Sequence, residues 1–216
     1  MNAYSFTQAT SEALSQHDIL KDVLHDPQFK AWGVLAAEYS KDAPVAMGNT
    51  LSVEKTQLKP VIQFTLNPEE KSPKVHDKDL FTLVVTDPDA PSRTDKKWSE
   101  YCHYVEADLK VLDHSATSSA SHVSEPQFVS AELKNGTVLQ QYQGPAPPKG
   151  TGKHRYVFVL YKQPDGVTGK QFTTIKDRPN WGFGEPATGV HRWATENKLE
   201  PVSVNFFYAE TKWLNR

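Results

Sequence analysis

Proline is the residue that most restricts how this chain can fold, because 15 prolines are spread over its 216 residues. Proline has no backbone N–H and a fixed φ angle, so it interrupts helices and ends strands. Between these turn signals lie short apolar segments that alternate with polar residues or run continuously, as strands do. They cover residues 31–39, 59–66, 79–86, 98–112, 138–142, 155–162 and 202–208. Many short strands and few helices predict an all-β sandwich rather than an α/β sheet.

Helical spacing of apolar residues occurs in two segments, residues 5–24 and 190–197. In the first segment, early Ser and Thr residues are suitable caps, and we expect a break near His17 and Asp18. Pro27 ends this segment, because the residue before a proline avoids helical geometry. The prediction is therefore an all-β dominated fold with an N-terminal helical segment and a further short helix.

Length and composition indicate a single globular domain over residues 1–216, with 38% hydrophobic residues and a formal net charge of −2. No dense run of Lys or Arg occurs, so no nucleic-acid partner is expected. No segment approaches the roughly 20 apolar residues of a transmembrane helix, and the N-terminus does not resemble a signal peptide. Cys102 is the single cysteine, which excludes an internal disulfide and fits a reducing compartment. We therefore expect a cytoplasmic protein.

The first candidate site is residues 144–158, GPAPPKGTGKHRYVF, a loop rich in proline and glycine that leads into a strand. Its prolines make the path of the loop stiff, and its glycines permit positive φ angles. In a strand, His154 and Tyr156 face one side and Arg155 the other. We expect the first two to form a pocket wall, and Arg155 to form an ion pair inside the scaffold.

The second candidate site directly follows the apolar run 79–86, where two aspartates and two prolines predict a constrained turn with one X–Pro bond able to be cis. Taken alone, this motif is a common turn. Together with His103 and His154 it predicts an anion pocket, in which imidazolium rings and backbone N–H groups bind phosphate or carboxylate. The aspartates would orient the rings and not contact the anion. In the strand 98–112, alternation assigns Tyr101, His103 and Val105 to one face, and Cys102, Tyr104 and Glu106 to the other.

Catalysis is the weaker alternative. Cys102 and His103 are adjacent and would face opposite sides of a strand, so they are not expected to act as nucleophile and base. No serine-hydrolase elbow, metal-binding H-E-x-x-H pair, phosphate-binding loop or dinucleotide fingerprint occurs. We predict no enzyme activity, no metal and no cofactor. Trp32, Trp98, Trp181 and Trp193 are expected to pack in the core or at sheet edges.

Two motifs, DPDAPSR (87–93) and GPAPPKGTGKHRYVF (144–158), together with His103, resemble the signatures of the phosphatidylethanolamine-binding protein family, the Raf kinase inhibitor protein group. Four further stretches resemble a fungal branch of that family. They are APVAMGNTL (43–51), KWSEYCH (97–103), KDRPNWGFGEPATGV (176–190) and NFFYAETK (205–212). The resemblance extends over essentially the whole chain.

The resemblance implies an antiparallel β-sandwich with short peripheral helices and an anion pocket at one end. The positions that match the pocket are Asp87, Pro88, Asp89, Pro91, His103, Pro148, His154 and Tyr156. The chain has Ala146 where many members have glycine, which is expected to narrow the pocket. It also stops soon after residues 208–212, without the C-terminal helix of animal members.

For function, the fungal resemblance implies an inhibitor of a vacuolar serine carboxypeptidase of the carboxypeptidase Y type. Residues 1–25 would be an inhibitory extension whose first residues enter the protease active site: Met1, Asn2, Tyr4 and Phe6. The alternative is a regulator of Ras or kinase signalling that binds an anionic phospholipid headgroup or a phosphorylated ligand. The resemblance also adds the vacuole as a second location beside the cytoplasm.

Overall fold

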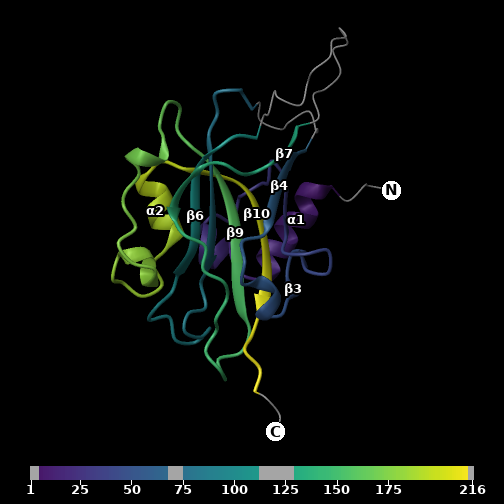
Figure 1. Ribbon diagram of the computed structural model, residues 1–216, viewed down its shortest axis with the longest axis vertical. Coiled ribbons are helices and arrows are strands. Elements are labelled where there is room, and N and C mark those ends of the chain that lie inside the picture. Colours follow the sequence, from purple (N-terminus) through teal and green to yellow (C-terminus); the bar gives the residue numbers. More distant parts are fainter. Residues whose placement is uncertain (1–4, 68–74, 112–128, 214–216) are drawn as a thin grey trace.

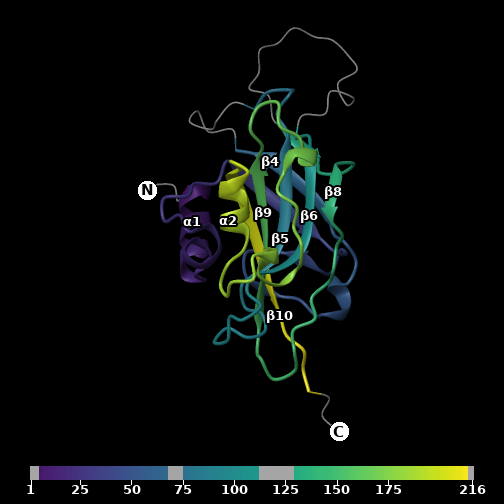
Figure 2. The ribbon, with the colours of Figure 1, turned by 90° about the vertical axis from the view of Figure 1, so that its left-hand side faces the viewer.

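The structure is a computed structural model that describes residues 5–67, 75–111 and 129–213. Two β-sheets pack face to face, and helices cover the outer side of the larger sheet (Figure 1). Viewed from the side, α1 and α2 lie together on that outer side (Figure 2). The predicted sandwich is therefore confirmed, with its helices gathered on one face.

The larger sheet has six strands in the order β3-β10-β9-β5-β6-β8. All neighbours are antiparallel except β3, which runs parallel to β10. The strands are β3 (Asn49–Thr50), β5 (Phe81–Asp87), β6 (Tyr101–Leu109), β8 (Thr137–Gln140), β9 (His154–Lys162) and β10 (Glu200–Ala209). The long members of this set were predicted. Strand β3 was not, because two residues are too few to show an alternating pattern.

The smaller sheet has four antiparallel strands in the order β2-β1-β4-β7. They are β1 (Gly33–Glu38), β2 (Pro44–Val45), β4 (Val61–Leu66) and β7 (Ser130–Glu132). Strand β1 alternates strictly between buried and exposed residues, as expected for a sheet with one face toward a core and one toward water. Its inner residues pack between the sheets against the larger one.

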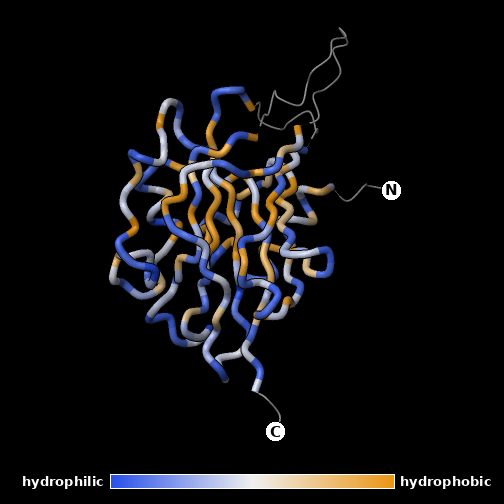
Figure 3. The backbone as a smooth tube through the Cα atoms, viewed as in Figure 1, coloured by the Kyte–Doolittle hydropathy of each residue, from blue (hydrophilic) through white to orange (hydrophobic). Residues whose placement is uncertain are grey.

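Strands β5 and β9 lie in the middle of the larger sheet and are buried on both faces. One face of the pair, with Val84 and Val159, packs beneath the helices. The other face, with Leu83 and Phe158, packs between the sheets. Because both faces are covered, these strands are continuously apolar, and they stand out in the centre of the hydropathy view (Figure 3).

The N-terminal helical segment consists of α1 (Phe6–Gln16) and a π-helical turn, η1 (Leu20–Leu24). Ser5 caps α1, since its hydroxyl oxygen accepts the N–H of Gln8 at 3.2 Å. Between the two helices Asp18 has a φ of 57°, so the predicted break is confirmed. The remaining helices are short: α2 (Val190–Glu196), η2 (Glu54–Thr56), η4 (Gly169–Gln171) and η5 (Pro179–Gly182).

Two sequence predictions remain to be placed. Residues 114–125 are rich in Ser, Ala and Thr, which predicts a surface loop, and they lie outside the described residues. Among the residues that the structure describes, no helix has the length and apolar content needed to cross a bilayer.

Candidate functional site

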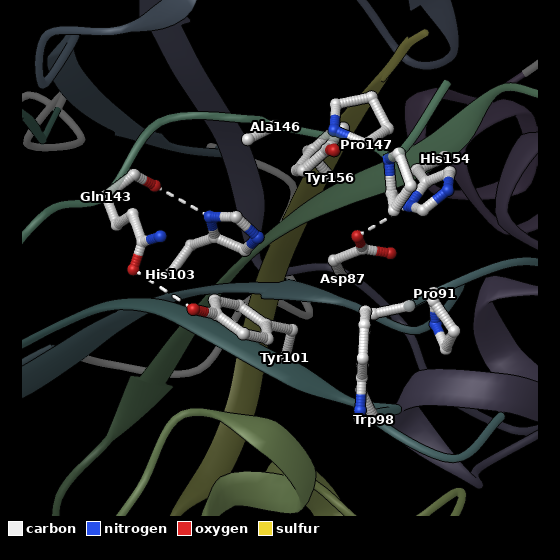
Figure 4. Close-up of a pocket in the computed structure, with 12 residues that line it drawn as sticks. Asp87, Pro91, Trp98, Tyr101, His103, Gln143, Ala146, Pro147, His154 and Tyr156 are labelled. Atoms are coloured by element: carbon white, nitrogen blue, oxygen red, sulfur yellow. Dashed lines mark hydrogen bonds and ion pairs between the residues drawn. The ribbon is translucent and has the colours of Figure 1, made fainter. Parts of the chain in front are cut away.

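A pocket of about 210 Å³ lies where β5 ends and β6 and β9 begin, at one end of the larger sheet. Because neighbouring strands are antiparallel, these three chain ends meet at the same edge. The lining residues are Asp87, Ala90, Pro91, Trp98, Tyr101, His103, Gln143, Ala146, Pro147, Pro148, His154 and Tyr156 (Figure 4). Six of the predicted pocket residues are in this set: Asp87, Pro91, His103, Pro148, His154 and Tyr156.

One side of the pocket is formed by a buried pair, Asp87 and His154. The Nδ1–H of His154 donates to Oδ2 of Asp87 at 2.8 Å (Figure 4). The other ring nitrogen, Nε2, lies 2.9 Å from the hydroxyl of Thr151, which also donates to the Pro148 carbonyl at 2.7 Å. The carboxylate and the hydroxyl together fix the orientation of the imidazole ring.

The opposite side of the pocket is formed by His103, which a β-bulge turns inward. Val85 pairs with Tyr104 and Thr86 with Cys102, so His103 has no partner on β5. The extra residue changes the alternation of the strand. Tyr104 packs between the sheets, whereas Val105 packs beneath the helices like Cys102. The predicted assignment of Val105 to the face of His103, and of Tyr104 to the opposite face, was therefore wrong.

His103 has one fixed and one free polar atom. Its Nδ1–H donates to the backbone carbonyl of Gln143 at 2.6 Å, and its other ring nitrogen is turned into the pocket (Figure 4). Burial lowers the pKa of His103 from 6.5, and the nearby Asp87 opposes this only in part. At neutral pH the ring is therefore neutral, and the nitrogen that faces the pocket is a hydrogen-bond acceptor.

The rest of the pocket wall is aromatic. Tyr156 lies parallel to the ring of His154 and edge-on to His103, with ring centroids 6.4 and 5.2 Å apart. Burial, and secondly Asp87, raise the pKa of Tyr156, so its phenol stays protonated. Tyr101 donates its hydroxyl to Oε1 of Gln143 at 3.2 Å. Lys and Arg are absent from the lining residues, so any positive charge in the pocket must come from the histidines.

Tryptophan packing agrees only in part with expectation. Trp181 and Trp193 are buried in the core beneath the helices, as predicted. Trp98 instead lines the pocket with 42% of its surface exposed, and Lys97 lies 5.0 Å from its ring. It therefore belongs to the rim of the pocket and not to the core.

Pro88 and Asp89 do not line the pocket. Asp89 is fully buried on the other side of the turn, where the guanidinium of Arg155 donates to both of its oxygens at 2.7 and 2.9 Å. Burial alone would raise the pKa of Asp89, but bonds from Arg155 and the charge of Lys96 outweigh it and lower the pKa to about 2. The expected internal ion pair of Arg155 is thus confirmed, with Asp89 as its partner.

The predicted inhibitory residues are described only in part. Met1, Asn2 and Tyr4 lie outside the described residues. Phe6 is the first residue of α1, and its side chain packs partly buried against the core beneath the helices. The rest of the segment contributes five fully packed side chains to that core: Leu14, Ile19, Leu20, Val23 and Leu24.

Sequence reasoning missed several residues of the pocket, above all Gln143 and Tyr101. Gln143 directly precedes the 144–158 motif, and Tyr101 lies inside the quoted KWSEYCH stretch. Tyr101 is the first residue of β6, two residues before His103, whereas Gln143 lies in the loop after β8. The sequence signal that could have found them is their position, because each lies beside or inside a motif that was already assigned to the pocket.

Comparison with known proteins agrees with the fold and with the motifs. Residues 27–208 match the family described as phosphatidylethanolamine-binding protein. The chain is 56% identical to the carboxypeptidase Y inhibitor of Saccharomyces cerevisiae, over 97% of this chain and 99% of that protein. An uncharacterised protein of the same yeast is 39% identical over 91% of each chain.

Two solved structures extend the comparison. The crystal structure of carboxypeptidase Y inhibitor complexed with the cognate proteinase has a TM-score of 0.88 and 56% identity, and covers 98% of this chain and 100% of that one. A phosphatidylethanolamine-binding protein from Plasmodium vivax has a TM-score of 0.68 at 19% identity, covers 94% of this chain and 97% of that one, and shows the shared fold alone. Sequence and structure thus lead to one conclusion: the chain belongs to the phosphatidylethanolamine-binding protein family.

Proposed function

We propose that this protein inhibits a vacuolar serine carboxypeptidase of the carboxypeptidase Y type. The proposal rests mainly on the 56% identity to the yeast carboxypeptidase Y inhibitor, which extends over 97% of this chain. The same relative adopts the same fold in its complex with the proteinase, with a TM-score of 0.88.

We further propose that residues 1–6 enter the active site of the protease. The family match begins at residue 27, so the N-terminal segment is an addition to the family domain. Met1 and Tyr4 are apolar anchors of the kind that fill a deep cleft, whereas Phe6 would first have to leave its packing against the core. A carboxypeptidase recognises a free C-terminal carboxylate, so an N-terminus in its cleft offers no bond to cleave.

Removal of residues 1–4 tests this assignment while leaving the cap Ser5 and the packing of Phe6 in place. We expect the truncated protein to inhibit yeast carboxypeptidase Y at least 100-fold more weakly, with an unchanged melting temperature. Leu58→Ala is the matched control, because Leu58 is an apolar residue with 83% of its surface exposed outside the N-terminus. Equal inhibition by the truncated and full-length proteins would contradict the assignment. A full-length protein that inhibits no serine carboxypeptidase in a panel would contradict the function itself.

The pocket supports a second function, binding of an anionic phospholipid headgroup or a phosphorylated ligand. Its size and its histidines motivate this proposal. His103→Ala should weaken the binding of inorganic phosphate and leave carboxypeptidase inhibition in place. Loss of both activities in a folded variant would mean that the pocket belongs to the inhibitory surface. The role as a regulator of Ras or kinase signalling stays a prediction from the resemblance.

We propose no catalytic role for this chain. Cys102 is buried beneath the helices, away from the pocket, and burial raises the pKa of its thiol well above the usual value. Cys102 is therefore not placed to act as a nucleophile with His103. The location in the cytoplasm and the vacuole also stays a prediction, which fractionation of cells with an antibody to the protein would test.

A further inference from the structure

Residues 87–93, here called the pocket loop, have contacts on two sides. Asp87, Ala90 and Pro91 line the pocket. On the other side, Arg93 pairs with Asp18 at 3.0 Å, between the two helices of the N-terminal segment. The pocket loop therefore contacts the pocket on one side. On its other side it contacts the N-terminal segment, which is proposed to inhibit the protease.

A stronger contact on the second side runs through Arg155, which has no exposed surface. Its guanidinium holds Asp89 of the pocket loop with two hydrogen bonds. The same group donates to the backbone carbonyl of His17 at 2.9 Å and pairs with Asp22 of η1 at 2.9 Å. One buried cation therefore binds the pocket loop and the N-terminal segment together.

The contacts continue from Asp89 to the pocket. The backbone N–H of Asp89 donates to Oδ1 of Asp87 at 2.7 Å, and the other oxygen of Asp87 accepts from His154. A ligand packed against the ring of His154 would therefore also restrain the carboxylate of Asp87, which is bonded to the pocket loop. His154 and Arg155 are neighbours on β9 and face opposite sides, so one strand supports both halves of this network.

These bonds tie the two sites energetically. Arg155 has no exposed surface, so the N-terminal segment cannot move away without removing two of the partners of a buried cation, the carboxylate of Asp22 and the carbonyl of His17. Contacts on either side of the pocket loop restrict the same backbone dihedrals. The conformational entropy that the loop loses on ordering is therefore lost only once, whichever side is bound first. A ligand on one side therefore makes ordering on the other side less costly.

We propose that the pocket loop and Arg155 link the two sites, so that a phosphate-class anion in the pocket strengthens the inhibition of the carboxypeptidase. The inference rests on the proposed function. Residues 1–4 directly precede Ser5, the N-cap of α1, in the sequence, so tighter docking of that helix fixes the point to which they are attached. Arg155 and Asp22 are then positioning residues for inhibition, although neither lines the pocket.

The test measures the inhibition constant toward yeast carboxypeptidase Y with and without saturating inorganic phosphate, at ionic strength matched with sodium chloride. We expect the inhibition constant to fall at least threefold with phosphate. A second arm compares phosphatidylserine vesicles with phosphatidylcholine vesicles, and tells a lipid headgroup from free phosphate. Hydrogen exchange of residues 6–24, measured without the protease, should slow when the anion binds.

Asp22→Asn should inhibit more weakly than the unmodified protein in the absence of anion and gain less from phosphate, because the bond of the segment to Arg155 is weakened. Glu12→Gln is the matched control: it removes one negative charge from α1, where the contact of Glu12 is to Gln8, and should respond like the unmodified protein. An inhibition constant unaffected by phosphate and by phosphatidylserine would overturn the proposal. An equal response in Asp22→Asn would also overturn it. If the unmodified protein fails to inhibit, the proposed function fails, while hydrogen exchange still tests the linkage.

Discussion

At the scale of single residues, the two aspartates of the DPD motif have separate tasks. Asp87 holds His154 on the pocket side, and Asp89 holds Arg155 on the helix side. His154 and Arg155 are the first two residues of β9 and face opposite sides. The four residues therefore form two hydrogen-bonded pairs, one on each face of the strand. A substitution of Asp87 is therefore expected to affect the pocket, whereas a substitution of Asp89 is expected to affect the contacts on the helix side.

Asp89→Asn should destabilise the fold by about 3 kcal/mol at pH 7, because it leaves Arg155 buried with a weakened partner. The lowered pKa of Asp89, about 2, means that its contribution is present above the usual value of 3.8 and is lost as the pH falls toward 2. Urea unfolding at pH 7 and at pH 3 measures both effects. Asp18→Asn is the control, since its pair with Arg93 is half-exposed and should contribute under about 1 kcal/mol. Equal losses in the two variants would contradict the assignment.

His103 should make anion binding depend on pH. The pKa of His103 is lowered from 6.5 in the protein without ligand, and an anion binds the protonated ring better than the neutral ring. The affinity of the pocket for an anion should therefore rise as the pH falls below neutral. We expect the affinity for sulfate, which keeps the same charge across this range, to rise at least about fivefold between pH 7.5 and 5.5. Calorimetric titration measures this. His103→Gln should bind with a flatter pH dependence, and an identical slope in the two proteins would argue against the role of His103.

At the scale of elements, the N-terminal segment lies before the residues that match the family and yet forms a layer of the core. Residues 27–208 match the family, yet Leu14 and Ile19 are fully buried against the larger sheet. The division into a domain with an extension at residues 1–25 stays a prediction. Leu14 and Ile19 hold the helical part of this segment in the core, which leaves residues 1–4 as the part proposed to act on a partner.

Leu14→Ala should cost about 3 kcal/mol of unfolding free energy, because it opens a cavity between α1 and the sheet. Leu58→Ala, at a site with 83% exposure, should change it by less than about 0.5 kcal/mol. Guanidinium unfolding followed by circular dichroism compares the two. A loss below about 1 kcal/mol in Leu14→Ala would mean that the segment packs only loosely.

A histidine contact between η1 and α2 should make the docking of the segment sensitive to acid. The rings of His25 and His191 are 4.8 Å apart, and the pKa of His25 is lowered, first by burial and then by His191, while Asp22 raises it. A lowered folded-state pKa means that stability is lost as the pH falls below 6.5. His191→Gln should therefore lose less stability between pH 7 and pH 5. Equal losses measured by thermal unfolding would contradict this.

At the scale of the whole molecule, the larger sheet separates two cores and belongs to both. Its central strands pack beneath the helices on one face and against the smaller sheet on the other. The side-chain amide of Asn205 on β10 also donates to Leu35 and Val45 of the smaller sheet, at 2.8 and 3.0 Å. Because both cores share the larger sheet, unfolding of one core would uncover a face of the sheet on which the other core depends.

Unfolding should therefore be a single cooperative transition, although the chain has 216 residues. Tryptophan fluorescence reports mainly on the core with Trp181 and Trp193, whereas far-ultraviolet circular dichroism reports on both sheets. The two signals should give the same midpoint in urea. Separate midpoints would show that the helix side opens before the sandwich does.

Most of the regular structure was predictable from the sequence. The long strands β5 and β9 are recognisable because they are buried on both faces and hence continuously apolar. The motifs at 87–93 and 144–158 identified the pocket and the family, since proline restricts the backbone locally and glycine permits the turn conformations that other residues avoid. These features depend on neighbours in the chain, so the sequence alone determines them.

Only the tertiary structure decided how the site is assembled. The bulge that turns His103 inward leaves no mark in composition, because any residue can be the extra one in a strand. The place of Asp89 outside the pocket depends on Arg155, and that of Arg155 on Asp22, which are far apart in the sequence. A charge withdrawn from water must find its partners in space. The sequence therefore indicated which residues form the pocket. The packing of the N-terminal segment decided which residues Asp89 and Arg155 contact on the other side of the pocket loop.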